Sequence, residues 1–159
     1  MHGKGAFKYD NVRIGWNSRL DTIQAAILQV KFKAFAEYEL KNINSVAEQY
    51  TKELEGIVKV PRIKEGFYSS WAQYTIQLES KKQRDDLQAY LKEAGIPTMV
   101  YYPKPMHQQL AFGQNKIYAE CLVSERLCDT VLSLPIHPYI EKKDIRMIID
   151  KVKFFLRND

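Results

Sequence analysis

Two polar stretches of the sequence contain residues that could bind a ligand. The first is IGWNSRLDTIQAA (14–26), in which Asn17, Ser18 and Arg19 precede a run with helical spacing. Free N–H groups at a helix N-terminus attract anions, and an arginine adds paired donors that suit a phosphate. The same residues also fit an ordinary capped helix in which Arg19 pairs with Asp21. Spacing alone favours that simpler reading.

The second stretch is VYYPKPMHQQLAF (100–112). It combines the end of a predicted strand, a stiff proline loop, a histidine and two side-chain amides. Loops held by a rigid scaffold carry binding sites more often than buried segments do. The alternative is a tight turn in which His107 caps the backbone.

Several familiar catalytic patterns are absent from the sequence. It contains three histidines and two cysteines, without a glycine-rich phosphate loop, a GxSxG elbow or a CxxC pair. Cys121 and Cys128 are seven positions apart, which predicts two small apolar groups on one helix face rather than a metal site. No metal is therefore expected.

The composition is that of an ordinary globular protein. The 159 residues are 45% hydrophobic and 27% charged, with a net charge of +5. There is no apolar run long enough to span a membrane and no apolar segment resembling a signal peptide at the N-terminus, so a cytoplasmic protein is expected. Basic and acidic residues are mixed along the chain, as where Lys81, Lys82 and Arg84 are followed at once by Asp85 and Asp86, which argues against a nucleic-acid-binding stripe.

Hydrophobic spacing predicts helices and short strands in alternation. The predicted helices are 18–34, in which Ser18 and Asp21 form a capping box, and 40–54, 84–94, about 116–128 and 142–156; the predicted strands are 57–60, 72–78, 98–102 and 131–134. This order predicts an α+β fold with a small antiparallel or mixed sheet covered by helices. The expected organisation is an extended arm (1–17), a helical connector (18–55) and an α+β domain (56–159).

Four ordered blocks carry a resemblance that covers nearly the whole chain. They are HG…KY…IGWNSRLDTIQAAIL, SSWAQYTI, RDDLQAYLKEAGIPTMVYYPKPMHQQLAF and LSLPIHPY. Together they resemble the C-terminal part of the DegT-type sugar aminotransferases. These are pyridoxal-phosphate enzymes of the aspartate-aminotransferase fold that act on nucleotide-linked keto sugars.

The resemblance implies roles for five residues. Asn17 would contact the cofactor phosphate, and Arg19 would lie beside it or beside the substrate diphosphate. His107 would help to hold the sugar nucleotide, with Tyr9 and Tyr102 as further substrate-binding candidates. The resemblance also implies a homo-oligomer, with a dimer as the expected form.

The chain departs from the family in length. Family members are more than twice as long, and the lysine that binds the cofactor as a Schiff base lies upstream of the HG block. No catalytic residue is therefore expected in this chain, which alone should be inactive and should not bind pyridoxal phosphate stably. The alternative is a non-catalytic binding or regulatory α+β module that self-associates. Nucleic-acid binding, a third hypothesis, rests only on the charge and on ten tyrosines.

Overall fold

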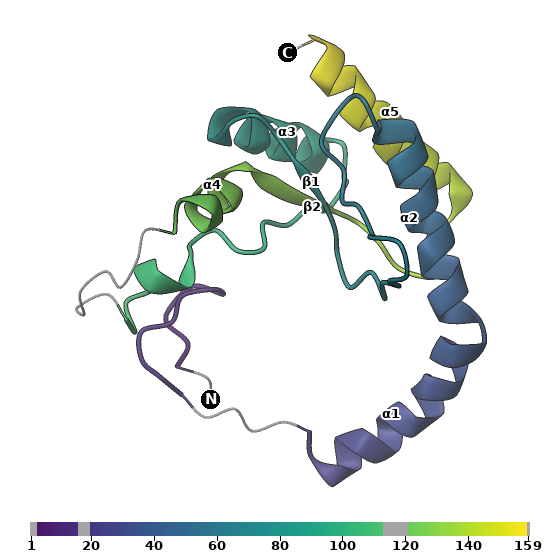
Figure 1. The fold of residues 1–159 in the computed structure, drawn as a ribbon, viewed down its shortest axis with the longest axis vertical. Helices are drawn as coiled ribbons and strands as arrows, with labels where there is room; N and C mark the ends of the chain where they lie inside the picture. The colour runs from purple at the N-terminus through teal and green to yellow at the C-terminus, as the bar shows by residue number, and fades with distance from the viewer. Residues whose placement is uncertain (1–2, 16–19, 113–120, 159) are drawn as a thin grey trace.

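The computed structural model describes residues 3–15, 20–112 and 121–158 and shows an α+β fold (Figure 1). The elements are α1 (Thr22–Ala34), α2 (Leu40–Leu54), β1 (Tyr74–Gln77), α3 (Lys81–Glu93), α4 (Leu122–Thr130), β2 (Val131–Leu134) and α5 (Lys142–Asn158). Strands β1 and β2 pair antiparallel, with Tyr74 opposite Leu134 and Gln77 opposite Val131. The predicted fold class, a small antiparallel sheet with covering helices, is confirmed.

Helices α1 and α2 are joined without a loop. A π-helical turn, Phe35–Glu39, connects them, and the backbone at both junctions stays in the right-handed helical region. The helix ends as expected before Gly56, whose φ of +81° falls in the left-handed region that glycine adopts readily. Figure 1 shows α2 beside α5 and α1 running away from the sheet.

Two predicted helix starts need correction. Helix α1 begins at Thr22, because the Asp21 side chain accepts a hydrogen bond from the Gln24 amide at 2.8 Å and so acts as the N-cap. The proposed cap at Ser18 lies outside the described residues. Helix α3 begins three residues earlier than predicted, because Ser80 caps it in the same way through Gln83. Its predicted end is confirmed, since Gly95 and Ile96 donate back to Lys92 and Leu91.

Two predicted strands are reduced to single bridges. Of the described residues, 57–60 pair with β1 through the single bridge Lys59–Gln77, and 98–102 pair with β2 through the single bridge Met99–Ser133. Pro61 follows the first segment and Pro97 and Pro103 flank the second, and a proline cannot donate to a sheet ladder. The helix predicted at about 116–128 is seen among the described residues as α4, which begins at Leu122, after Cys121, and continues to Thr130.

The core lies between the sheet and helices α2, α3 and α5. Its fully buried large side chains are Tyr50, Leu54, Tyr74, Ile76, Leu87, Leu91, Ile96, Leu132 and Val152. Along β1 the predicted alternation is confirmed, with Tyr74 and Ile76 buried and Thr75 and Gln77 half-buried. Helix α2 supplies part of this core, whereas α1 buries none of its residues. The division into connector and domain at residue 56 stays a prediction.

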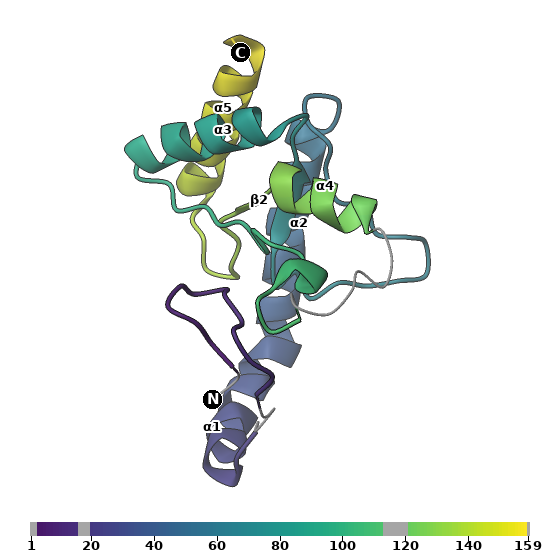
Figure 2. The same ribbon diagram turned by 90° about the vertical axis from the view of Figure 1, so that its left-hand side faces the viewer.

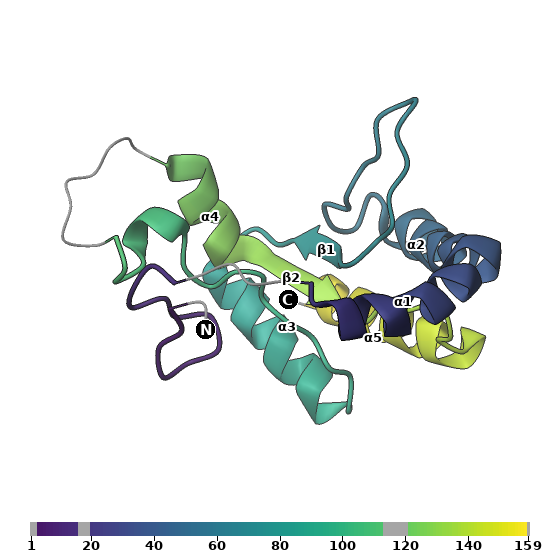
Figure 3. The same cartoon turned by 90° about the horizontal axis from the view of Figure 1, so that it is seen from below.

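The turned views place the remaining segments. In Figure 2 the N-terminal arm lies beside the short 3₁₀ helix Met106–Gln108, and Figure 1 shows the arm on the side of the molecule away from α2. In Figure 3 the segment between α2 and β1 projects away from the sheet. The arm and the turn before α4 therefore meet at one end of the molecule, opposite the α2–α5 pair.

Candidate functional site

A cavity of about 810 Å³ lies where the arm meets the 101–109 loop and α4. We call it the arm pocket. The arm supplies Lys8, Tyr9 and Asn11; the loop supplies Tyr101, Tyr102, Lys104, Pro105, Met106, His107 and Gln109; β1, α4 and β2 supply Thr75, Cys121, Ser124, Leu127, Cys128 and Val131. Ligand pockets commonly have volumes of roughly 300–1,000 Å³. The arm pocket is large enough for a nucleotide-sized ligand.

The arm is a small irregular hairpin. Two backbone hydrogen bonds join its two sides: Gly5 N donates to Asp10 O at 2.8 Å, and Val12 N donates to Gly3 O at 2.9 Å. Gly3 has a φ of +73°, and a Cβ there would lie 1.7 Å from the Arg13 carbonyl oxygen. Only glycine fits at this position. The hairpin turns Tyr9 toward the pocket.

Three tyrosine rings form one wall of the pocket. The Tyr9 ring meets Tyr101 at a centroid distance of 5.8 Å and Tyr102 at 5.3 Å, both edge to face. The Lys8 ammonium lies 5.2 Å from the centre of the Tyr9 ring. Hydrogen bonding to Tyr9 and burial raise the pKa of Tyr101 above its ordinary value. This wall offers aromatic faces together with hydroxyl donors.

His107 lies in the same loop and is held by Glu125 of α4. Its Nε2 donates a hydrogen bond to Oε1 of Glu125 at 2.8 Å, and both side chains are partly exposed. The partner fixes the orientation of the ring. The sequence had also allowed a tight turn in which His107 caps the backbone. In the structure the His107 ring instead bonds to the side chain of Glu125, 18 residues away.

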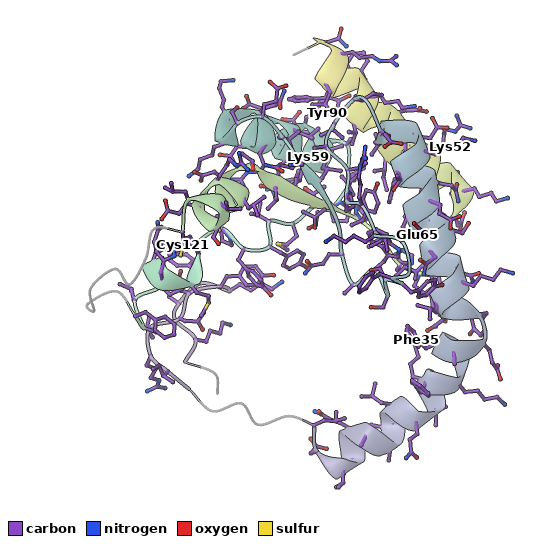
Figure 4. All side chains as sticks on the ribbon, viewed as in Figure 1. Phe35, Lys52, Lys59, Glu65, Tyr90 and Cys121 are labelled. Atoms are coloured by element: carbon purple, nitrogen blue, oxygen red, sulfur yellow. The ribbon has the colours of Figure 1, made fainter. Side chains whose placement is uncertain are left out.

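Cys121 and Cys128 are half-buried, and both line the arm pocket. Figure 4 places Cys121 at the start of α4, beside the 3₁₀ helix. Burial raises the pKa of the Cys128 thiol, which keeps it protonated and poorly nucleophilic. The prediction of one helix face needs correction for Cys121, which is the residue before the first turn of α4.

Three of the five residues singled out from the sequence meet in this pocket. Tyr9, Tyr102 and His107 all line it, although Tyr9 is about 100 positions away from the other two. Asn17 and Arg19 lie outside the described residues. The sequence patterns did not single out Tyr101, Gln109 or Glu125, which the structure places at or beside the pocket. The pair Tyr101–Tyr102 was visible as a motif, but nothing in the spacing linked Glu125 to His107.

A lysine that binds pyridoxal phosphate as a Schiff base needs a desolvated setting that lowers its pKa. No lysine in residues 3–15, 20–112 or 121–158 is buried. Lys31, for example, is exposed, and hydrogen bonds to Glu39 and Tyr139 raise its pKa. None of the lysines in those parts of the chain therefore has the buried setting that such a lysine needs.

Two other classes of site find no support where the structure can be followed. His, Cys, Asp and Glu side chains do not gather in groups of three that could hold a metal ion in the described segments. Over the same segments, each helix is too short or too polar to cross a bilayer.

Comparison with known proteins identifies the family. Residues 1–153 match the DegT/DnrJ/EryC1/StrS aminotransferase family. The UDP-2-acetamido-2-deoxy-3-oxo-D-glucuronate aminotransferase of Pseudomonas aeruginosa is 39% identical over 92% of this chain and 39% of its own length. A protein of Geobacillus stearothermophilus named "Pleiotropic regulatory protein" is 38% identical over 99% of this chain and 42% of its own length.

A solved structure agrees with this assignment. The crystal structure of a DegT DnrJ EryC1 StrS aminotransferase from Brucella abortus is 46% identical, with a TM-score of 0.77. The match covers 97% of this chain and 40% of that one, so the chain spans about two fifths of the length of its relatives. The resemblance noted in the sequence is confirmed: the chain belongs to the DegT/DnrJ/EryC1/StrS aminotransferase family.

Proposed function

We propose that this chain forms the C-terminal part of a pyridoxal-phosphate-dependent aminotransferase that acts on a nucleotide-linked keto sugar. The observation that carries the proposal is the arm pocket, which gathers Tyr9, Tyr102 and His107 from distant parts of a chain of this family. The Pseudomonas relative acts on a UDP-linked 3-oxo acetamido sugar, and we propose the same class of substrate here.

The pocket lining suits such a ligand. The edge-to-face tyrosines provide flat surfaces for a base or a sugar ring, and their hydroxyls can bond to sugar oxygens. Lys8 and Lys104 line the same cavity and carry positive charge that favours a diphosphate. His107, oriented by Glu125, adds a directed polar contact.

The family depends on pyridoxal phosphate. When bound, this cofactor acts as an electron sink for the carbon that exchanges its amino group. We propose that Asn17 and Arg19 bind its phosphate, and that the Schiff-base lysine belongs to a part of the full enzyme other than this chain. The 159-residue chain alone should then lack transaminase activity and stable cofactor binding.

We also propose that the full enzyme is a homo-oligomer, with a dimer as the expected form. Helix α1 exposes Ile23, Ile27 and Val30, and apolar surface of this kind is seldom left uncovered. The cytoplasmic location expected from the sequence remains part of this proposal.

One observation favours a second candidate function. The Geobacillus relative carries the name of a regulatory protein and matches nearly the whole chain. A non-catalytic regulatory module that self-associates through α1 is therefore the alternative.

A chimeric enzyme tests the proposal. In the Pseudomonas aminotransferase, the segment that aligns with this chain would be replaced by residues 1–159, and formation of the amino sugar nucleotide would be measured. We expect turnover, and we expect Tyr9→Ala and His107→Asn each to raise KM for the sugar nucleotide about tenfold, the loss of roughly 1.4 kcal/mol of binding. Tyr68→Ala is the matched control, because Tyr68 is 68% exposed and does not line the pocket.

Two outcomes decide between the candidates. A folded chimera that binds the cofactor but neither turns over nor binds the sugar nucleotide would contradict the aminotransferase proposal and leave the regulatory one. An active chimera whose KM is unchanged by Tyr9→Ala and His107→Asn would support the aminotransferase proposal and contradict the assignment of the substrate site to the arm pocket.

A further inference from the structure

Gln109 is a buried polar side chain that connects the arm to the loop of the arm pocket. The residue is 3% exposed, and both ends of its side-chain amide are bonded. Its Oε1 accepts from the Asn11 amide at 3.0 Å, and its Nε2 donates to the carbonyl oxygens of Tyr9 at 3.2 Å and Lys104 at 3.3 Å. One side chain thus joins backbone groups about 100 residues apart.

The other contacts between the arm and the rest of the described chain are the Tyr9 ring contacts, a side-chain hydrogen bond between Tyr9 and Tyr101, and one backbone bond. The hairpin bonds run within the arm itself, and its larger apolar side chains point to solvent, with Phe7 75% and Ile14 77% exposed. One backbone bond, from Ala111 N to Asn11 O at 2.8 Å, supplements the Gln109 contacts. With the arm in this place, the Tyr9 ring packs edge to face against Tyr101 and Tyr102.

We infer that Gln109 is a positioning residue that holds the arm so that Tyr9 completes the wall of the arm pocket. Two of its hydrogen bonds hold the backbone next to the Tyr9 side chain, one at the Tyr9 carbonyl and one at the Asn11 amide two residues later. Without the side chain, these part-buried backbone groups would lose their partners, and the cost of leaving them unpaired favours release of the arm from the surface. The role of Tyr9 in substrate binding rests on the proposed function, whereas the placement of the arm does not.

Hydrogen exchange on the 159-residue chain tests the placement directly. In the parent, the amide of Asn11 should exchange slowly because Gln109 accepts its hydrogen bond. In Gln109→Leu we expect its protection to fall at least about tenfold, which corresponds to 1.4 kcal/mol. Gln108→Leu is the matched control, since Gln108 is the exposed neighbour, and it should leave the exchange of Asn11 unchanged.

A conservative variant guards against simple unfolding. Gln109→Glu keeps an oxygen that can accept from Asn11 but loses the two donor contacts, so it should give an intermediate loss of protection. The amide of Leu132, in the core, should stay protected in all variants. If Gln109→Leu does not fold, the protection of the Asn11 amide in Gln109→Glu is the measurement that tests the inference. Protection of Asn11 equal to the parent in a folded Gln109 variant would overturn the inference.

The chimeric enzyme then tests the consequence for binding. Gln109→Leu and Tyr9→Ala should each raise KM for the sugar nucleotide with little change in kcat. The double variant should be no worse than either single one, because both remove the same contact. An arm released in the exchange experiment together with an unchanged KM would uphold the placement of the arm by Gln109 and contradict the assignment of Tyr9 to the substrate.

Discussion

Helices α1 and α5 both carry apolar residues at intervals of three and four, although those of α1 are less confined to one face, and the two helices have opposite surroundings. Ile145, Ile148 and Ile149 of α5 are each 3% exposed. On α1, Ile23 is 74% exposed and Ile27 66%. The stripe at intervals of three and four residues therefore predicts a helix in both places, but it does not say whether this chain supplies the surface that covers it. The difference shows that α5 belongs to the core of this chain and α1 faces outward from it (Figure 1).

The largest expected effect comes from one substitution made in both helices. Ile149→Ala should lower the free energy of unfolding by about 2–5 kcal/mol, because it opens a cavity in the core. Ile27→Ala should change it by less than about 0.5 kcal/mol, because the side chain is already in contact with water. Urea unfolding of the 159-residue chain, followed by circular dichroism, measures both. Equal losses would mean that α1 is as well packed as α5.

A second prediction concerns the surface of α1. If its exposed stripe drives self-association, then Ile27→Lys should weaken association by roughly tenfold or more, since it puts a charge where apolar area would be buried. Sedimentation over a wide concentration range measures the change. Met147→Lys on α5, where Met147 is 42% exposed, is the control and should leave association intact. A parent chain that stays monomeric at all concentrations would contradict the prediction.

The helix caps offer a smaller and more local comparison. Ser80 caps α3, which contributes Leu87 and Leu91 to the core, so Ser80→Ala should cost about 1 kcal/mol of global stability. Asp21 caps α1 with the same geometry. Asp21→Ala should reduce the helical signal of α1 while leaving the urea midpoint of the core nearly unchanged. A shift of the midpoint as large as that of Ser80→Ala would show that α1 folds together with the core.

The smallest predicted effect concerns Glu39, which connects Lys31 of α1 to Tyr139 just before α5. Glu39, in the π-helical turn near Phe35 (Figure 4), is 4% exposed and hydrogen-bonded by Lys31 and by the Tyr139 hydroxyl. The Tyr139 hydroxyl also lies 3.4 Å from that of Tyr38. The bond from Lys31 and that from Tyr139 hold the pKa of Glu39 below its usual value. Its stabilising contribution is therefore complete above the unfolded pKa, about 4.3, and is lost as the pH falls through the lower folded value.

Glu39→Gln tests this link. The parent should lose stability between neutral pH and about pH 3 more steeply than the variant, since the variant has no carboxyl to protonate at that site. Glu37→Gln, an exposed change in the same turn, is the control and should keep the acid sensitivity of the parent. Urea midpoints at the two pH values measure the difference. The same slope in parent and Glu39→Gln would contradict the assignment.

The sequence predicted the parts of the fold that depend on local signals. The strand at Tyr74–Gln77 followed from alternation, and the ends of α2 and α3 followed from Gly56 and Gly95. The predicted strands at 57–60 and 98–102 were too long, because pairing at a sheet edge depends on neighbours that local residue preference does not specify. The π-helical turn gave no distinct signal, since its residues are ordinary helix formers.

The candidate site divides in the same way. Residue types and family motifs by themselves indicated Tyr9, Tyr102 and His107, because aromatic, hydroxyl and imidazole groups in proline-rich and glycine-rich loops are suited to ligands. Only the tertiary structure decided that these residues share one pocket, that Glu125 holds His107, and that Gln109 fastens the arm. Those contacts join residues 18 to 100 positions apart. Local periodicity describes how neighbours along the chain fold, whereas long-range contacts arise only when separate elements pack against each other.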